Sequence, residues 1–265
     1  MAIKRYTATA DTTITNAYKA DMITRGTDGN MGASDTMEVF SIYAQAASGS
    51  AEAARSLVQF STTDIASDRA SDYIPASGSV SFYLRLFNAE HAQTTPTNFT
   101  MTVTAVSRSW REGLGLDMEG YTDLDNANWV TASSGAAGPV LWTAEGGDYW
   151  VDSSSSFDVD FETGVEDLEV DVTHLVEQWL AGTKNNYGFG VKLSGSHETE
   201  TRSYYTKRFF ARGSEYFFKR PTLEARWDSS EKDNRGNFFV SSSLATPADN
   251  LNTLYLYNNI SFFSF

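Results

Sequence analysis

The stretch Phe99-Thr-Met-Thr-Val-Thr104 decides the fold class, because apolar and hydroxyl side chains alternate along it without interruption. A period of two puts successive residues on opposite faces of a β-strand, one face buried and the other in water. The same alternation marks four more segments, 82–87, 167–172, 188–193 and 222–227. Half-buried strands of this kind build antiparallel sheets. The sequence therefore predicts an all-β fold, an antiparallel β-sandwich of the jelly-roll kind.

Helices contribute little to the predicted fold. We expect one short helix, which begins at Thr173 as its N-cap and ends at Gly182. Leu175 and Trp179 are four residues apart and share its apolar face. Trp179, and Trp227 on the last alternating segment, are expected to lie in the core.

Composition and charge limit the possible functions. The 265 residues are 41% hydrophobic and 20% charged, as is typical of a globular chain. Cysteine is absent, which excludes disulfides, thiolate metal sites and a cysteine nucleophile. The net charge is −14 and the basic residues are dispersed, so we expect no nucleic-acid partner. We interpret this acidity as a source of solubility and of repulsion between monomers, with cation binding as the alternative.

Targeting and membrane segments are not expected. The residues that follow Met1 include basic side chains without an apolar run behind them, which argues against a secretory signal. No uninterrupted apolar run approaches about 18 residues, so we predict no membrane-spanning helix and no membrane partner.

The composition of the chain changes after Trp227, where the apolar alternation stops and a charged stretch rich in turn-forming residues begins. We predict a jelly-roll domain over residues 1–228 and, over 229–265, a linker with an aromatic C-terminal arm or the start of a second domain. About 30 residues cannot bury a core of their own, so the arm must dock on its own sandwich or on another subunit. The predicted interface residues of the arm are Phe238, Phe239, Leu254, Tyr255, Tyr257, Phe262 and Phe263.

Several fragments occur together in a recognisable order. The most specific, Asp171 to Gly190, joins a strand end, a helix with a tryptophan, a glycine stop and an Asn-Tyr-Gly turn. The others are Ala10 to Ile14, Asn30 to Val39, Arg55 to Phe60, Ala105 to Gly113, Gly146 to Tyr149, Lys207 to Glu215 and Arg220 to Ala225. Over about residues 5 to 228, the chain resembles the DNRLRE-domain family of β-sandwich modules.

This resemblance implies a non-catalytic module. The family occurs in bacterial surface and secreted proteins, in some cases as alginate-type carbohydrate-binding modules, and in phage structural proteins. The chain departs from the family pattern in two places, an insert from Leu114 to Asn128 (the acidic insert) and Ala211 where the family usually has serine.

Residues with catalytic chemistry do not group in the sequence. His91, His174 and His197 are scattered and have no metal-binding spacing. Acidic pairs such as Glu166 with Asp167 arise by chance among 34 acidic residues, which leaves a glycosidase carboxylate pair as the weakest alternative. We predict no catalytic residue and no organic cofactor.

Two kinds of binding site remain open. Asp11, Asn30 and Asp171 stand near strand ends, where carboxylates and carbonyls hold Ca²⁺ in many sandwich proteins, although plain turn capping also explains them. Trp129, Trp142 and Trp150 stand in Gly-, Ser- and Asp-rich loops, where they either form a glycan platform or anchor a protein interface.

The sequence as a whole favours a bacteriophage virion structural protein of the capsid, neck, tail or baseplate. The expected partners are copies of itself and other virion proteins, and the expected location is the virion. Three features support this: the expected lack of a signal peptide, the lack of cysteine, and an aromatic arm that needs a partner. The alternative is a carbohydrate-binding module or a receptor-binding, lectin-like domain.

Overall fold

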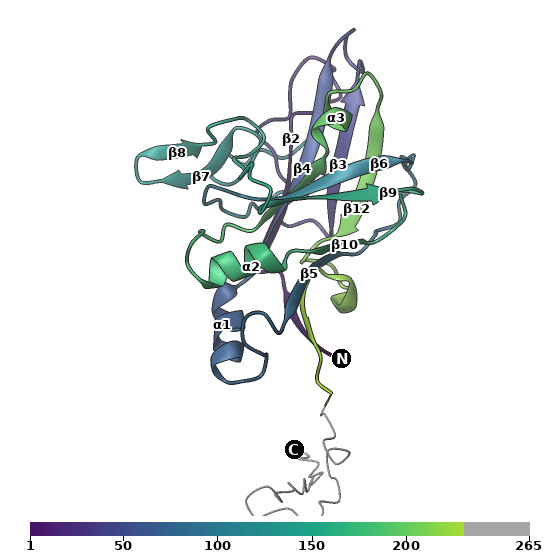
Figure 1. The fold of residues 1–265 in the computed structure, drawn as a ribbon. Coiled ribbons are helices and arrows are strands. Elements are labelled where there is room, and N and C mark those ends of the chain that lie inside the picture. Colours follow the sequence, from purple (N-terminus) through teal and green to yellow (C-terminus); the bar gives the residue numbers. More distant parts are fainter. Residues whose placement is uncertain (231–265) are drawn as a thin grey trace, which may run out of the picture. The chain divides into compact units, whose positions relative to one another are not determined.

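The computed structural model describes residues 1–230 of the chain, and within them Ala2–Trp227 form one compact unit. This unit is built from antiparallel sheets with few helices (Figure 1). One sheet has, in spatial order, β1 (Ala2–Thr7), β13 (Thr222–Trp227), β5 (Ser81–Leu86) and β10 (Leu168–Asp171). The larger sheet has β12 (Tyr204–Phe210), β3 (Thr36–Tyr43), β4 (Ala51–Gln59), β11 (Phe189–Leu193), β6 (Phe99–Ala105) and β9 (Ser156–Phe161), with β2 (Ala10–Thr15) also paired to β4. A separate hairpin consists of β7 (Thr131–Gly135) and β8 (Gly138–Leu141).

The strand order confirms the predicted jelly roll. Its eight strands, taken in chain order, are β1, β4, β5, β6, β9, β10, β11 and β13. Numbered in that order, they lie as 1-8-3-6 in one sheet and as 2-7-4-5 in the other, which is the jelly-roll arrangement of two interleaved Greek keys. Strands β3 and β12 extend the second sheet beyond this set.

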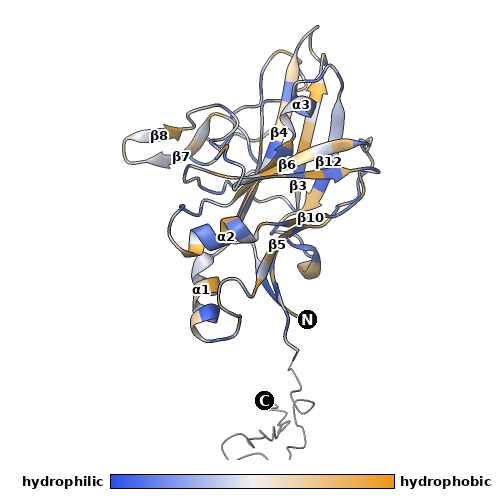
Figure 2. Ribbon diagram, in the orientation of Figure 1, coloured by the Kyte–Doolittle hydropathy of each residue, from blue (hydrophilic) through white to orange (hydrophobic). Residues whose placement is uncertain are grey.

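The main core lies between the two sheets. Leu84 on β5 is paired with Leu223 of one neighbouring strand and Val170 of the other, so apolar residues align across the sheet. Met101 and Val103 of the facing sheet belong to the same buried cluster. Trp179 is buried there as predicted, and Trp227 is half-buried against the cluster. Hydrophobic and hydrophilic residues follow one another in short stretches along the strands (Figure 2), as the period of two requires.

A second, smaller core covers the other face of the larger sheet. Leu57 and Val58 are adjacent on β4 and therefore point to opposite faces. Val58 belongs to the main core, whereas Leu57 packs with Trp110, Trp129 and Trp142. These tryptophans come from the long connection between β6 and β9, which folds back over the sheet. The larger sheet is thus covered on both faces.

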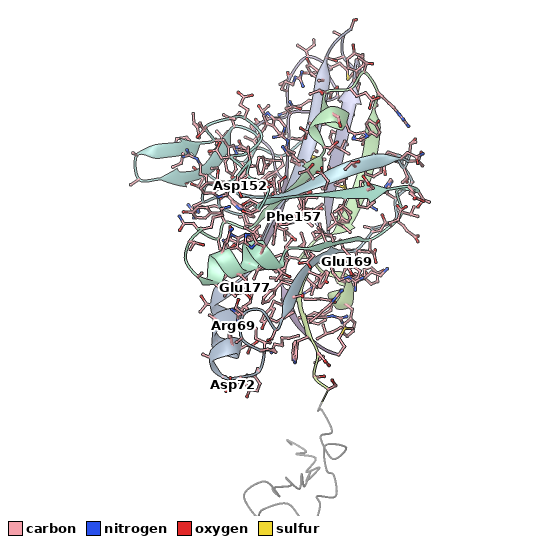
Figure 3. All side chains as sticks on the ribbon, in the orientation of Figure 1. Arg69, Asp72, Asp152, Phe157, Glu169 and Glu177 are labelled. Carbon is pink, nitrogen blue, oxygen red and sulfur yellow. The ribbon has the colours of Figure 1, made fainter. Side chains whose placement is uncertain are left out.

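The predicted helix is present as α2 (Thr173–Leu180), although Val172 and not Thr173 is its N-cap. Two further helices were not predicted, α1 (Thr62–Ala70) and α3 (Gly195–Glu198), so the expectation of a single helix was wrong. Only Ile65 of α1 is buried, and a single apolar residue creates no periodic signal. Instead, Arg69 binds Glu177 of α2 with two hydrogen bonds of 2.6 and 2.9 Å (Figure 3). Within residues 1–230, no helix is long and apolar enough to cross a membrane.

Candidate binding sites

Two of the three tryptophans of the predicted platform are not exposed. Trp129 and Trp142 are both buried in the second core, so as sugar-stacking surfaces they were predicted wrongly. The indole N–H of Trp142 donates to the Asn128 carbonyl oxygen at 2.9 Å, which fixes the ring inside. Their loop is long enough to fold back on the sheet, and burial of the rings is favourable. Trp150 alone stays accessible, with 39% of its surface exposed.

The three predicted calcium ligands have separate partners. Asp11 on β2 accepts the Arg212 backbone N–H, and Asp171 on β10, in the other sheet, accepts the Thr173 N–H. Asn30 is buried against the acidic insert. Its side-chain Nδ2 donates to Asp123, and its side-chain Oδ1 accepts the Gly115 backbone N–H. They therefore do not form one ligand set. Across residues 1–230, no group of three or more His, Asp or Glu side chains is placed to hold a metal ion.

Two glutamates that the sequence offers for a glycosidase carboxylate pair, Glu112 (with Asp117 and Glu119 nearby in the sequence) and Glu166, are also engaged. Glu112 binds the Arg212 guanidinium at 2.7 and 3.2 Å. Glu166 accepts the backbone N–H groups of Glu162 and Thr163 at 3.0 and 2.6 Å. Burial raises its pKa, but hydrogen bonds that include the Thr163 N–H outweigh burial and lower the pKa to about 2. Each of these groups has a structural partner that explains its position.

A cleft of about 770 Å³ lies beside the second core. Strands β4 and β11 and the connection between β6 and β9 contribute its walls. The side chains in it that suit ligand contact are Arg55, Arg108, Tyr149, Tyr187 and Lys192. The cleft therefore combines basic and aromatic groups with two carboxylates, Glu145 and Asp148.

Lys192 is the lining cation with no acidic partner among the described residues. Arg55 pairs with Glu198 at 2.8 Å, and Arg108 pairs with Asp148 at 2.5 Å. The Lys192 ammonium instead lies 5.1 Å from the centre of the Tyr149 ring, and burial lowers its pKa. We call this the Lys192 cleft. Its charge is free to meet an anionic group.

Tyr149 is fixed in the Lys192 cleft by Gly190 of β11. A Cβ atom at position 190 would come within 2.2 Å of the tyrosine ring, so only glycine lets the ring lie on the strand. The Tyr149 hydroxyl donates to the Gly146 carbonyl oxygen at 2.8 Å, and burial raises its pKa to about 12. The ring is therefore rigid and neutral.

A second feature is the turn between β12 and β13, where three consecutive aromatic residues face solvent. Tyr216, Phe217 and Phe218 are 56%, 57% and 81% exposed, and we call them the aromatic turn. A short 3₁₀ helix, Phe217–Lys219, shapes it. The Arg220 side chain donates to the Ser214 carbonyl oxygen at 2.9 Å and closes the loop. Sequence analysis did not single out these residues.

Comparison with known protein families finds no family model that matches the chain, and comparison with curated proteins finds no match. The resemblance to the DNRLRE-domain family therefore stays a prediction. The fold rests on the strand topology itself. The predicted interface residues of the arm, from Phe238 to Phe263, lie outside the residues that the structure describes.

Proposed function

We propose that the chain is a non-enzymatic structural module of a bacteriophage virion, which acts through contacts with copies of itself and with other virion proteins. The observation that carries the proposal is the aromatic turn. Aromatic side chains are enriched at protein interfaces relative to the rest of the protein surface. Burial of a Phe side chain contributes about 1.5–3 kcal/mol, and two adjacent ones give a symmetric assembly repeated contacts of useful strength.

The geometry of the aromatic turn supports a role in binding rather than in folding. Phe217 and Phe218 contact each other edge to face at 5.5 Å, and Tyr216 packs likewise on Phe210 at 5.4 Å. The rings thus hold one another in place while most of their surface stays in water. Because this order exists before a partner arrives, less conformational entropy is lost on binding.

A double substitution tests the proposal. Phe217→Ser with Phe218→Ser leaves the sandwich folded, because neither side chain is in a core, and lowers incorporation into virions by at least about tenfold. Incorporation is measured by complementing the phage gene and analysing purified particles. Tyr73→Ser is the matched control, because Tyr73 is an exposed aromatic residue at another place on the surface. Normal incorporation of the double variant rejects the aromatic turn as the contact.

A second candidate function is the binding of an acidic glycan, and the Lys192 cleft favours it. The unpaired ammonium suits a carboxylate or sulfate, and Tyr149 and Tyr187 offer aromatic surface to a sugar ring. Lys192→Met should then abolish binding to acidic polysaccharides on a glycan array. Lys4→Met, which removes an exposed lysine from β1, should leave binding intact. No signal on any glycan with the unaltered chain counts against this function.

A further inference from the structure

A separate cleft of about 850 Å³ opens where the acidic insert passes over the larger sheet. Strands β3, β4 and β12 form one side of it, and residues 17–18 with residues 117–120 form the other. Its lining includes the side chains of Tyr18, Phe40, Ile42, Glu52, Glu119 and Tyr205. We call this the Glu52 cleft. It shares no lining residue with the Lys192 cleft.

Glu52 lies buried in the wall of this cleft. Its exposed fraction is 2%, and its Oε2 accepts the Tyr18 backbone N–H at 2.7 Å. Its Oε1 has no hydrogen-bonding partner within the described part of the protein, and no Lys, Arg or His of that part forms an ion pair with Glu52. A buried carboxylate costs free energy unless a donor or an opposite charge meets it.

The other charges of the Glu52 cleft do not supply that opposite charge. Arg208 is the one basic side chain among the described residues that line it, and Arg208 pairs with Glu38 at 2.6 Å. The acidic insert adds Asp117 and Glu119 to the lining. Three carboxylates thus share the cleft with one cation that is already paired. The three carboxylates create a negative electrostatic potential in the cleft, and the low dielectric constant of the protein walls strengthens it. The cleft therefore attracts a positively charged ligand.

Apolar and aromatic groups complete the Glu52 cleft. Phe40 of β3 and Tyr205 of β12 form an edge-to-face pair with ring centres 5.2 Å apart. Ile42 is the cross-strand partner of Glu52, so an aliphatic surface lies directly beside the carboxylate. A ligand with an aliphatic stem and a positive head matches both parts, because rings attract cations and the stem covers apolar area.

We propose that the Glu52 cleft binds an organic cation, an ammonium or guanidinium group on an aliphatic stem, with the positive head at Glu52 and the stem against Ile42, Phe40 and Tyr205. The cation is either a free amine or a basic side chain of a partner protein, since both present the same head and stem. This site is independent of the aromatic turn and of the Lys192 cleft.

Isothermal titration of the full chain at low salt tests the proposal with three probes: agmatine, spermidine and an arginine residue blocked at both ends. Binding of the free amines assigns the site to small ligands, whereas binding of the blocked arginine alone assigns it to a protein side chain. Titration reaches about 10 mM, where a site with a Kd of about 1 mM is close to saturated.

Two variants and one control connect binding to the cleft. Glu52→Gln keeps the shape and the Tyr18 contact but removes the charge, and it weakens binding by about tenfold or more. Glu119→Gln, on an exposed loop, keeps the test valid if the first variant fails to fold, and weakens binding about twofold. Glu90→Gln removes an exposed charge elsewhere and changes nothing.

Two results would overturn the inference. One is the absence of binding by all three cationic probes, whether or not Ca²⁺ or a neutral sugar binds. The other is equal binding by the wild type and a folded Glu52→Gln variant.

Discussion

Replacement of Asp11 by asparagine should stabilise the protein at neutral and alkaline pH but not at acidic pH. Asp11 is buried on β2, where its Oδ2 accepts the Arg212 backbone N–H. Its own N–H donates to Glu112 at 2.9 Å, so a second carboxylate is close by. Oδ1 has no partner within residues 1–230. Burial raises the Asp11 pKa to about 7; the nearby Glu112 adds to the rise, and the Arg212 N–H opposes it.

The magnitude follows from the size of this shift. A rise from 3.8 to about 7 is about three pKa units, or about 4 kcal/mol. Below about pH 4 the carboxyl is protonated in both the folded and the unfolded chain and has no effect on the pH dependence. Between about pH 4 and 7 the unfolded chain loses the proton and the folded chain keeps it, so the free energy of unfolding falls. Above about pH 7 both forms of the chain are ionised, and the free energy of unfolding falls no further because of Asp11.

Asparagine resembles the protonated aspartate in shape and carries no charge at any pH. We therefore expect Asp11→Asn to match the wild type at pH 4 within about 1 kcal/mol and to exceed it by up to about 4 kcal/mol at pH 8. Urea unfolding at the two pH values, followed by tryptophan fluorescence, measures the difference. Asp125→Asn, at an exposed position, is the control and should show no such pH-dependent gain. The reasoning is refuted if the difference between Asp11→Asn and wild type is the same at pH 4 and pH 8.

Three other substitutions test the packing and polar contacts. Gly190→Ala should lower the free energy of unfolding by about 1–3 kcal/mol, because its Cβ meets the Tyr149 ring, and the added cost should largely vanish in a Tyr149→Ala background. Lys207→Met should cost about 3 kcal/mol in urea unfolding, since the buried ammonium donates to Asn88, Gly164 and Glu166 at 2.7, 2.8 and 2.7 Å; unchanged stability would contradict this. Arg69→Ala should lower the free energy of unfolding by about 1 kcal/mol and speed amide hydrogen exchange in α1, while the amides of β5 stay protected. If the α1 amides exchange at the same rate in the variant as in the wild type, the Glu177 contact does not hold the helix.

The strands were predictable because each carries a local signal. Phe99 to Thr104 alternates strictly, and in the structure Met101 and Val103 are in the main core while Thr100 and Thr102 bond to aspartates of β9. In a half-buried strand, adjacent residues alternate between the apolar core and water, so the sequence alternates between apolar and polar residues. The helix around Trp179 was predictable for the same reason, since its apolar face repeats at helical spacing.

The second core was not predictable from local pattern. Trp129 and Trp142 stand in a stretch whose composition is that of an exposed loop, and their burial depends on contacts with Leu57, more than 70 residues away. A composition rich in Gly, Ser and Asp predicts an irregular backbone around a residue. It does not predict against which part of the protein a long connection packs. The length of the connection between β6 and β9, together with its tryptophans, was the available clue.

The two clefts and the aromatic turn differ in how far the sequence reveals them. The Glu52 cleft joins residues 17–18, β3, β4, residues 117–120 and β12, which no spacing in the sequence connects. The acidic insert that covers it was nevertheless visible as a departure from the expected family pattern. Phe217 and Phe218 are adjacent aromatic residues outside any alternating segment, but their exposure is visible only in the structure.

If the chain is a virion protein as proposed, its gene belongs to a phage, and quantitative mass spectrometry of purified particles of that phage is the most direct test. The proposal predicts that peptides of this chain are present in many copies per particle and remain after a high-salt wash, since apolar contacts resist salt. Recovery of the chain only from the particle-free lysate would contradict the proposal.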